Sequence, residues 1–397
     1  LGDVLGPGTP IVSRLYVIAC SCGKRLVIGQ EMLGKTGKCA HCAQPVLVDP
    51  KLALPYSEEG PTDEEKRQLA TMSNDGVPVE WKQGDVILDL YEVTGLLGEG
   101  GMGKVYKVIH RNWNMPLAVK SPKARIVLRS DGAANFEQEC ETWVNLGLHP
   151  HIVSCHYVRR LGGVPRVFAE YVDDGSILEW IQNGRLYEGG PQKALSRICD
   201  FGVQMCWGLQ HAHDHGLVHQ DVKNANVLIA GGELAKVTDF GLARARALVD
   251  PEADPGNVSG DVTNVGMTRF YCSPEQANRE KLSKKTDMWS WAMSMLEMFT
   301  VKIVWYKGTE GPAILNKFLD QSVNNPRMLP IPAPLAAVMK RCLDVNQENR
   351  PESMNEIAAH AAEAYKVVTG QAYPRTQPRA TEALANSLNN RALALLD

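Results

Sequence analysis

Four short motifs, far apart in the chain, constrain its fold more than any other feature. A polar stretch, His219-Gln-Asp-Val-Lys-Asn-Ala-Asn226, precedes the apolar run Val227–Ile229, and Thr238-Asp-Phe-Gly241 comes soon after. Much earlier lie a glycine-rich stretch, Gly98-Glu-Gly-Gly-Met-Gly103, and an apolar run that ends in Ala118-Val-Lys120. Each motif alone is typical of a solvated loop or a strand end. Found together, in this order and at these separations, they make that interpretation very improbable.

The glycine-rich stretch does not match two better-known nucleotide loops. Val105 follows Lys104, so the Gly-Lys-Ser/Thr ending of a phosphate-binding loop is missing. A strand-like run follows the glycines, whereas a dinucleotide-binding loop opens a helix. The remaining interpretation is a glycine hairpin whose backbone folds over phosphates without side-chain clashes.

The hydrophobic pattern changes along the chain from strand-like to helical. Strand-like runs cover residues 91–97, 104–110, 117–120 and 167–172. One helix interrupts them, because Phe136, Cys140, Trp143 and Val144 recur at helical spacing. Later helices are indicated by Leu195, Ile198, Met205, Leu209 and Ala212, and by the buried stretch Met288–Thr300.

On these motifs, residues 85–367 resemble the eukaryotic-like serine/threonine protein kinases of bacterial type. The resemblance implies an α+β, two-lobed fold, in which a small antiparallel β lobe with one helix is joined by a hinge to a large helical lobe. It implies that ATP and Mg²⁺ or Mn²⁺ bind between the lobes, and that the γ-phosphate passes to serine or threonine hydroxyls of proteins. Lys223 and Thr268 are typical of this class rather than of the tyrosine kinases.

The resemblance also implies roles for single residues. Asp221 is the catalytic base, Lys223 places charge near the γ-phosphate, and Lys120 contacts the α- and β-phosphates. Glu139 holds Lys120, with its neighbours Glu137 and Glu141 as alternatives. The implied nucleotide-binding residues are Gly98, Gly100, Gly103, Val105, Ala118, Lys120, Glu170, Val172, Asn226 and Asp239. Asn226 and Asp239 are also the expected metal ligands, because hard cations prefer oxygen.

Supporting positions follow from the same resemblance. Ala169–Val172 would be the hinge, with Ala169 as a small gatekeeper residue. Glu275 of Ser273-Pro-Glu would pair with Arg350, and Asp287 would steady the catalytic loop.

Gln220 stands where family members usually carry an arginine that grips a phosphorylated activation loop. A neutral amide cannot form a charge-assisted bidentate pair with phosphate. We therefore expect activity to depend only weakly on phosphorylation of the activation segment. That segment, residues 245–264, is long and acidic; Ser259, Thr263 and Thr268 are either phosphorylation sites or solvated hydroxyls.

A separate cysteine cluster lies near the start of the chain. Cys20, Cys22, Cys39 and Cys42 lie in residues 11–50, which resemble a zinc ribbon, a small β module held by structural Zn²⁺. The spacing favours this over two disulfides, with His41 as an alternative ligand and with docking or structural support as the expected role. The other six cysteines are scattered, as expected of free thiols in a reducing cytoplasm.

The remaining segments are expected to be linkers and one helix. Residues 51–84 and 368–379 have linker composition. Residues 380–397 resemble the opening helix of a tetratricopeptide repeat, so they either begin a partner-binding array or form a terminal amphipathic helix.

Composition narrows the function further. Net charge is −3, from 42 basic and 45 acidic residues, which makes nucleic-acid binding an unfavoured alternative. No uninterrupted apolar run reaches membrane-spanning length and no secretion signal is expected. A catalytically silent kinase-like scaffold is the other alternative, but each catalytic position carries its required chemical group.

Overall fold

The computed structural model describes residues 15–19, 25–29, 32–39, 44–48, 54–55, 67, 69, 75–99, 103–128, 132–240, 268–320, 325 and 327–378. The chain divides into two compact units, residues 1–60 and 61–397.

The first unit consists of short antiparallel strands. β1 (Leu15–Ala19) pairs with β2 (Arg25–Gly29) and β5 (Leu54–Pro55), while β3 (Thr36–Lys38) pairs with β4 (Pro45–Leu47). Short strands of this kind agree with the predicted small β module.

One of the four expected zinc ligands lies within the described residues. Cys39 follows β3, is buried, and donates its backbone N–H to the carbonyl of Gln44 at 2.8 Å. Cys20, Cys22 and Cys42 lie outside the described residues. The zinc site therefore stays a prediction.

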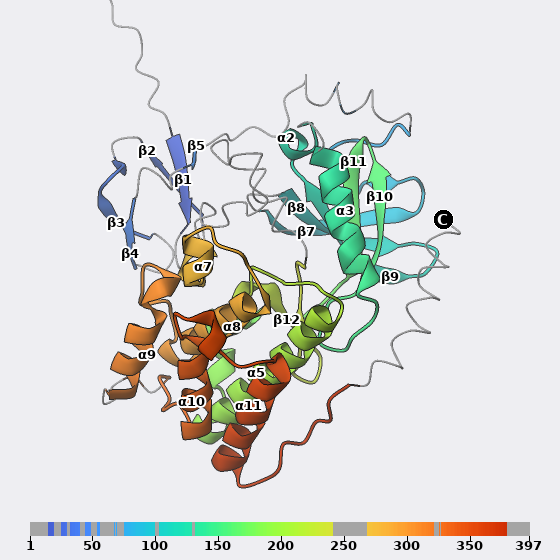
Figure 1. The fold of residues 1–397 in the computed structure, drawn as a ribbon. Helices are drawn as coiled ribbons and strands as arrows, with labels where there is room; N and C mark the ends of the chain where they lie inside the picture. Colours follow the sequence, from blue (N-terminus) through green and yellow to red (C-terminus); the bar gives the residue numbers. More distant parts are fainter. Residues whose placement is uncertain are drawn as a thin grey trace, which may run out of the picture. The chain divides into compact units, whose positions relative to one another are not determined.

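The small lobe of the second unit is a six-stranded antiparallel sheet with two helices (Figure 1). Its strand order is β10-β11-β9-β8-β7-β6. The strands are β6 (Val86–Ile87), β7 (Tyr91–Glu99), β8 (Gly103–His110), β9 (Met115–Pro122), β10 (Cys155–Leu161) and β11 (Val164–Glu170). The helices are the single turn α2 (Ala124–Val127) and α3 (Gly132–Asn145). The one helix expected in this lobe is α3, and Phe136, Cys140 and Trp143 on its predicted apolar face are buried.

The large lobe is mainly helical, as predicted. Its α-helices are α4 (Ile177–Asn183), α5 (Pro191–Asp214), α7 (Pro274–Ala277), α8 (Lys284–Thr300), α9 (Gly311–Asp320), α10 (Ala333–Cys342) and α11 (Met354–Thr369). Short 3₁₀ turns and strands complete it: η2 (Arg185–Tyr187), η3 (Asn224–Asn226), β12 (Val227–Ala230), β13 (Leu234–Val237), η5 (Thr268–Phe270), η6 (Gly308–Glu310) and η7 (Gln347–Asn349). Every residue from Lys285 to Thr300 is buried, so α8 is the central support of the lobe. Helices α5 and α11 lie side by side in Figure 1.

Two segments with linker composition pack against the second unit. Residues 75–85 cover part of the small lobe, with Trp81 buried in its core. After α11, Tyr373 donates its hydroxyl to Asp200 at 2.6 Å, and Arg375 donates to both Asp200 carboxylate oxygens at 2.8 and 3.0 Å. These segments are held in place by buried polar partners, and composition alone does not reveal such contacts. Residues 380–397 lie outside the described residues.

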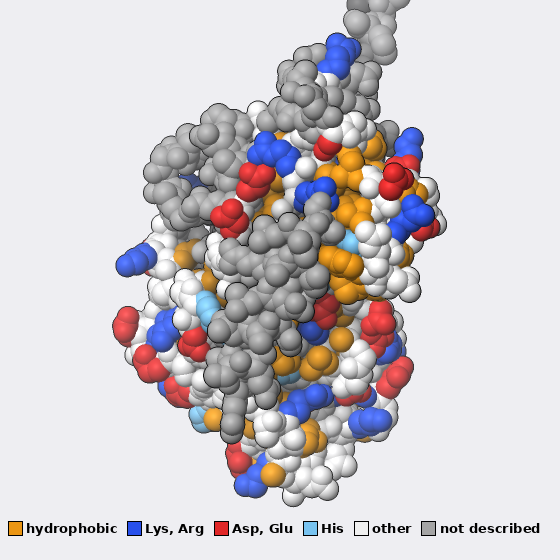
Figure 2. Space-filling model, turned by 90° about the vertical axis from the view of Figure 1, so that its right-hand side faces the viewer, with side chains coloured by type: hydrophobic (Ala, Val, Ile, Leu, Met, Phe, Trp, Pro, Cys, Tyr) orange, Lys and Arg blue, Asp and Glu red, His pale blue; other side chains and the backbone are white. Residues whose placement is uncertain are grey.

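The described surface mixes both signs of charge. On the face in Figure 2, Lys and Arg side chains are interspersed with Asp and Glu. Among the described residues, no helix is both long enough and apolar enough to span a membrane.

Candidate active site

A cleft of about 460 Å³ brings together residues from both lobes. The small lobe contributes the end of β7, residues of β8, β9, β11 and α3, and the segment that joins the lobes. The large lobe contributes the start of α4, the turn before β12, β12 itself and residues after β13. Eight of the predicted nucleotide-binding residues line it: Gly98, Val105, Ala118, Lys120, Glu170, Val172, Asn226 and Asp239. Of the other two, Gly103 begins β8 and Gly100 lies outside the described residues.

The glycine-rich segment closes tightly on the neighbouring strand at Gly103. A Cβ atom at this position would lie 1.9 Å from the carbonyl oxygen of Ser121, which no side chain tolerates. Glycine is required here because the two strands approach so closely.

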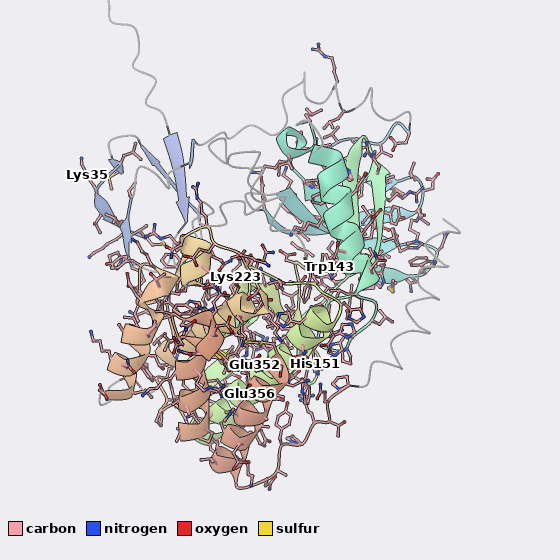
Figure 3. The ribbon with its side chains drawn as sticks, in the orientation of Figure 1. Lys35, Trp143, His151, Lys223, Glu352 and Glu356 are labelled. Atoms are coloured by element: carbon pink, nitrogen blue, oxygen red, sulfur yellow. The ribbon has the colours of Figure 1, made fainter. Side chains whose placement is uncertain are left out.

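Lys120 on β9 reaches across the cleft to Asp239. Its ammonium Nζ lies 2.9 Å from Asp239 Oδ2, and both side chains are mostly shielded from water. Trp143, at the end of α3 nearest the large lobe in Figure 3, also lines the cleft and donates from Nε1 to the carbonyl of Val153 at 2.9 Å. The predicted partner of Lys120, Glu139, lies on α3, but its side chain is outside the described residues.

Residues 219–226, which the resemblance implies to be the catalytic loop, hold the carboxylate of Asp221 between two donors. Lys223 donates from Nζ to Oδ2 at 2.6 Å, and Asn226 donates from Nδ2 to the same oxygen at 2.9 Å. Figure 3 places Lys223 in the large lobe. The carboxylate is buried, so these two donors and the surrounding loop fix its orientation.

The same contacts test whether Asn226 and Asp239 fit a divalent cation. The amide Nδ2 of Asn226 donates to the carbonyl and the carboxylate of Asp221. The amide oxygen of Asn226 is therefore the atom that can coordinate a metal. Asp239 adds carboxylate oxygens to the same cleft. This oxygen set is the kind that Mg²⁺ and Mn²⁺ prefer.

Asp287 on the buried helix α8 anchors the backbone of the catalytic loop. Its carboxylate accepts the backbone N–H groups of His219 and Gln220, each at 2.8 Å, and lies 2.8 Å from His213 Nε2. These bonds hold Gln220 at φ +65°, a conformation that costs energy for any residue except glycine. The anchoring expected of Asp287 therefore has a direct geometric basis.

A buried ion pair fixes the end of the activation segment. Arg350 donates to both carboxylate oxygens of Glu275 at 2.7 and 2.9 Å, and Thr286 donates its hydroxyl to Glu275 at 2.9 Å. Burial alone would raise the pKa of Glu275, but the guanidinium and the hydroxyl hold it below its usual value. This is the pairing that the resemblance implies.

Glu297 is a supporting residue that the sequence pattern did not identify. Its carboxylate accepts the Tyr271 hydroxyl at 2.5 Å and the amide of Asn224 at 2.7 Å. It therefore links α8 to the catalytic loop and to the segment before Ser273. Burial raises the pKa of Glu297 to about 7. The available signal was a single carboxylate inside the apolar stretch Met288–Thr300.

The segment that joins the lobes is fixed by the side chain of Glu170. Lys236 Nζ lies 2.8 Å from its carboxylate, and the backbone N–H of Ser154 donates to it at 3.1 Å. Ala169 is buried beside it, and its small side chain leaves the cleft open toward Val153 and Trp143. Residues 245–264 of the activation segment lie outside the described residues.

Comparison with known proteins assigns this architecture. The model of the protein kinase domain family matches residues 91–362. A protein named probable serine/threonine-protein kinase of Clostridium acetobutylicum is 28% identical over 69% of this chain and 40% of its own length. The serine/threonine-protein kinase PknB of Mycolicibacterium smegmatis is 29% identical over 77% and 46%. The chain thus spans less than half the length of these curated relatives.

A crystal structure of the Mycobacterium tuberculosis PknI kinase domain is similar in fold. It has a TM-score of 0.52 at 21% identity, and the match covers 72% of this chain and all of that domain. Its two-lobed architecture agrees with the fold described above.

Proposed function

Because this chain belongs to the protein kinase domain family, we propose that it transfers the γ-phosphate of ATP to serine or threonine hydroxyls of other proteins. One observation supports this most directly. Lys120, Asn226 and Asp239, which are distant in sequence, line a single cleft, and Asn226 donates to the buried carboxylate of Asp221. That set supplies a cation for phosphate, oxygen ligands for a metal and a base for the hydroxyl.

Each residue has a distinct part in the reaction. Asp221 orients the substrate hydroxyl and accepts its proton while the oxygen forms a bond to the γ-phosphorus. The bond between that phosphorus and the oxygen bridging to the β-phosphate breaks, and ADP leaves. Lys223 places positive charge beside Asp221, where negative charge develops on the moving phosphoryl group. A Mg²⁺ or Mn²⁺ ion held by Asn226 and Asp239 would neutralise charge on the β- and γ-phosphates.

The ion pair between Lys120 and Asp239 suits this reaction. The ammonium balances the Asp239 carboxylate at 2.9 Å. With a metal held by Asp239, Lys120 would be the cation for the phosphate oxygens, with the carboxylate of Glu139 as its proposed partner.

Label transfer from ATP tests the proposal and its alternative, a catalytically silent scaffold. The full chain is incubated with labelled ATP, Mg²⁺ and a protein substrate, beside Asp221→Asn and Asp239→Asn. We expect transfer by the parent chain and losses of at least about 100-fold in each variant, since a single electrostatic group contributes several kcal/mol. Absent transfer, or equal transfer by all three proteins, would favour the scaffold.

Phosphatase treatment in the same assay tests the role of Gln220, and we expect it to change the rate less than about threefold.

We further propose that Cys20, Cys22, Cys39 and Cys42 hold structural Zn²⁺ in the first unit. The short strands and the burial of Cys39 support this. A unit of this size has a small core, and metal binding would add on the order of 10 kcal/mol to its stability. Elemental analysis of the purified chain should find one zinc per molecule, and Cys39→Ser should reduce it. Metal-free protein with an intact first unit would refute the site.

A further inference from the structure

The segment just before the kinase match, residues 75–85, packs on the small lobe; we call it the strap. Asp75 accepts the backbone N–H of Gly162 at 3.0 Å, in the turn between β10 and β11. Gly162 has φ +62°, and a Cβ there would lie 2.5 Å from the carbonyl oxygen of Val77. The turn therefore has no room for a side chain where the strap crosses it.

Arg166, a fully buried arginine on β11, joins the strap to the strand that carries Lys120. Its Nη2 donates to the carbonyl of Val79 at 2.5 Å, and its Nη1 donates to Ser121 Oγ at 2.6 Å. The guanidinium also lies 4.0 Å from the ring of Trp81. Burial lowers the pKa of Arg166 to about 10, so it stays charged at neutral pH. A buried guanidinium is strongly destabilising unless such partners satisfy it.

A second contact joins the strap to the glycine-rich segment. Glu80 pairs with Lys104 Nζ at 2.5 Å, and Lys104 follows directly after Gly103. In the sheet, Lys104 lies opposite Ser121 and Gly103 lies opposite Pro122. The contacts of Arg166 and Glu80 therefore meet at one point of the β8–β9 ladder, between the glycine-rich segment and Lys120.

We propose that the strap positions the phosphate-binding face of the small lobe, and that Arg166 and Glu80 are positioning residues for ATP. This inference rests on the proposed function, because that function identifies the nucleotide as ATP. Arg166 fixes Ser121, the residue after Lys120, and Glu80 fixes Lys104, the residue after Gly103. The strap lies outside the residues matched by the family model, which begin at 91.

The test measures nucleotide binding separately from phosphate transfer. The dissociation constant of Mg²⁺-ATP is determined by calorimetry on the full chain, and KM for ATP and kcat are measured with a protein substrate. Glu80→Gln should raise the dissociation constant and KM about two- to threefold, as expected of a half-exposed ion pair. Arg166→Lys should raise both about tenfold, since lysine lacks the fork that spans Val79 and Ser121. In both variants, kcat at saturating ATP should stay within about twofold.

The large lobe offers a matched control. Glu356 pairs with Arg341 at 2.5 Å and has a side chain 33% exposed, against 2.5 Å and 32% for Glu80. Glu356→Gln should leave nucleotide affinity unchanged. Combining Glu80→Lys with Lys104→Glu re-forms the ion pair with its charges exchanged, and it should restore the affinity that Glu80→Lys alone loses.

The outcomes separate this inference from the proposed function. Unchanged affinity in both Glu80→Gln and Arg166→Lys overturns the role of the strap while phosphate transfer stands. If Arg166→Lys does not fold, the dissociation constants of Glu80→Gln and of the charge-exchange variant decide whether the strap has this role. If the variants weaken nucleotide binding but no protein transfers phosphate, the strap has its role and the proposed activity falls.

Discussion

Two bidentate arginine–glutamate pairs, one in each lobe, share a geometry and differ in their surroundings. Arg350 contacts both carboxylate oxygens of Glu275 at 2.7 and 2.9 Å, and Arg160 contacts those of Glu137 at 3.0 and 2.9 Å. The first pair is 0% and 1% exposed, and the second is 37% and 31% exposed. The buried pair cannot lose one partner without leaving a charge in a dry interior, whereas water replaces a lost partner in the exposed pair.

The difference extends to the two halves of the active site. The catalytic loop is anchored on buried groups of α8, Asp287 and Glu297. The glycine-rich segment has a half-exposed anchor, the pair of Glu80 with Lys104. Residues 219–226 therefore rest on groups that are shielded from water, whereas the glycine-rich segment has one anchor that water reaches, beside the buried Arg166.

The largest expected effect comes from breaking the buried pair. Arg350→Met leaves the Glu275 carboxylate buried without its guanidinium, so the free energy of unfolding should fall by about 3–5 kcal/mol. Denaturant unfolding of the full chain, followed by tryptophan fluorescence, measures this. Adding Glu275→Gln should recover part of the loss. A loss below about 1 kcal/mol in Arg350→Met would contradict the contrast between the lobes.

Asp287→Asn should reduce the rate of transfer about 10- to 100-fold, as expected when a buried donor is left unpaired. The new amide NH₂ faces backbone N–H groups of His219 and Gln220, so at least one of them loses its acceptor. The backbone of residues 219–226 then loses its fixed geometry, while the cleft residues proposed to contact ATP are unchanged. Steady-state kinetics should show a lower kcat with a nearly unchanged KM for ATP. A raised KM with a normal kcat would place the role of Asp287 elsewhere.

Glu297 predicts a pH dependence of stability with a definite sign. Its pKa is raised by burial to about 7, above its value in the unfolded chain. The folded state therefore binds the proton more tightly, and this stabilisation is full below about pH 4.3 and is lost as pH rises through 7. Between pH 5 and 7, Glu297 alone should lower the free energy of unfolding by up to about 1.4 kcal/mol per pH unit.

Comparing the parent chain with Glu297→Gln isolates this contribution. As the pH rises from 5 to 7, the parent chain should lose unfolding free energy relative to Glu297→Gln. A difference independent of pH would show that Glu297 has no raised pKa.

The smallest effect is expected at the exposed pair. Arg160→Gln should change the free energy of unfolding by less than about 1 kcal/mol, and less still at high salt. The measurement is the same as for Arg350→Met. A loss as large as that of the buried pair would remove the distinction drawn between the lobes.

The sequence predicted the two-lobed fold and the apolar faces of its main helices. Strand β10 was not predicted, because Arg159 and Arg160 interrupt its apolar pattern and it depends on pairing with β11. For the candidate site, spacing and resemblance named eight of the residues that line the cleft, since the order of these motifs along the chain is distinctive.

Contacts made through the backbone could not be predicted in this way. The strap contacts Arg166 through the carbonyl of Val79, and any residue can supply a carbonyl. The segment was therefore expected to be a linker on composition. The role of Glu297 depends on where Tyr271 and Asn224 meet in space, which a linear pattern does not specify.

The contacts of Arg166 and Arg375 indicate where the boundaries of a fragment for crystallisation should lie. A fragment limited to the family match, residues 91–362, would remove the carbonyl that caps Arg166 and the guanidinium that neutralises Asp200. The buried guanidinium of Arg166 in the small lobe and the buried carboxylate of Asp200 in the large lobe would then each lose a polar partner. Boundaries at 75 and 378 keep both contacts, and such a fragment should give the better yield of folded protein.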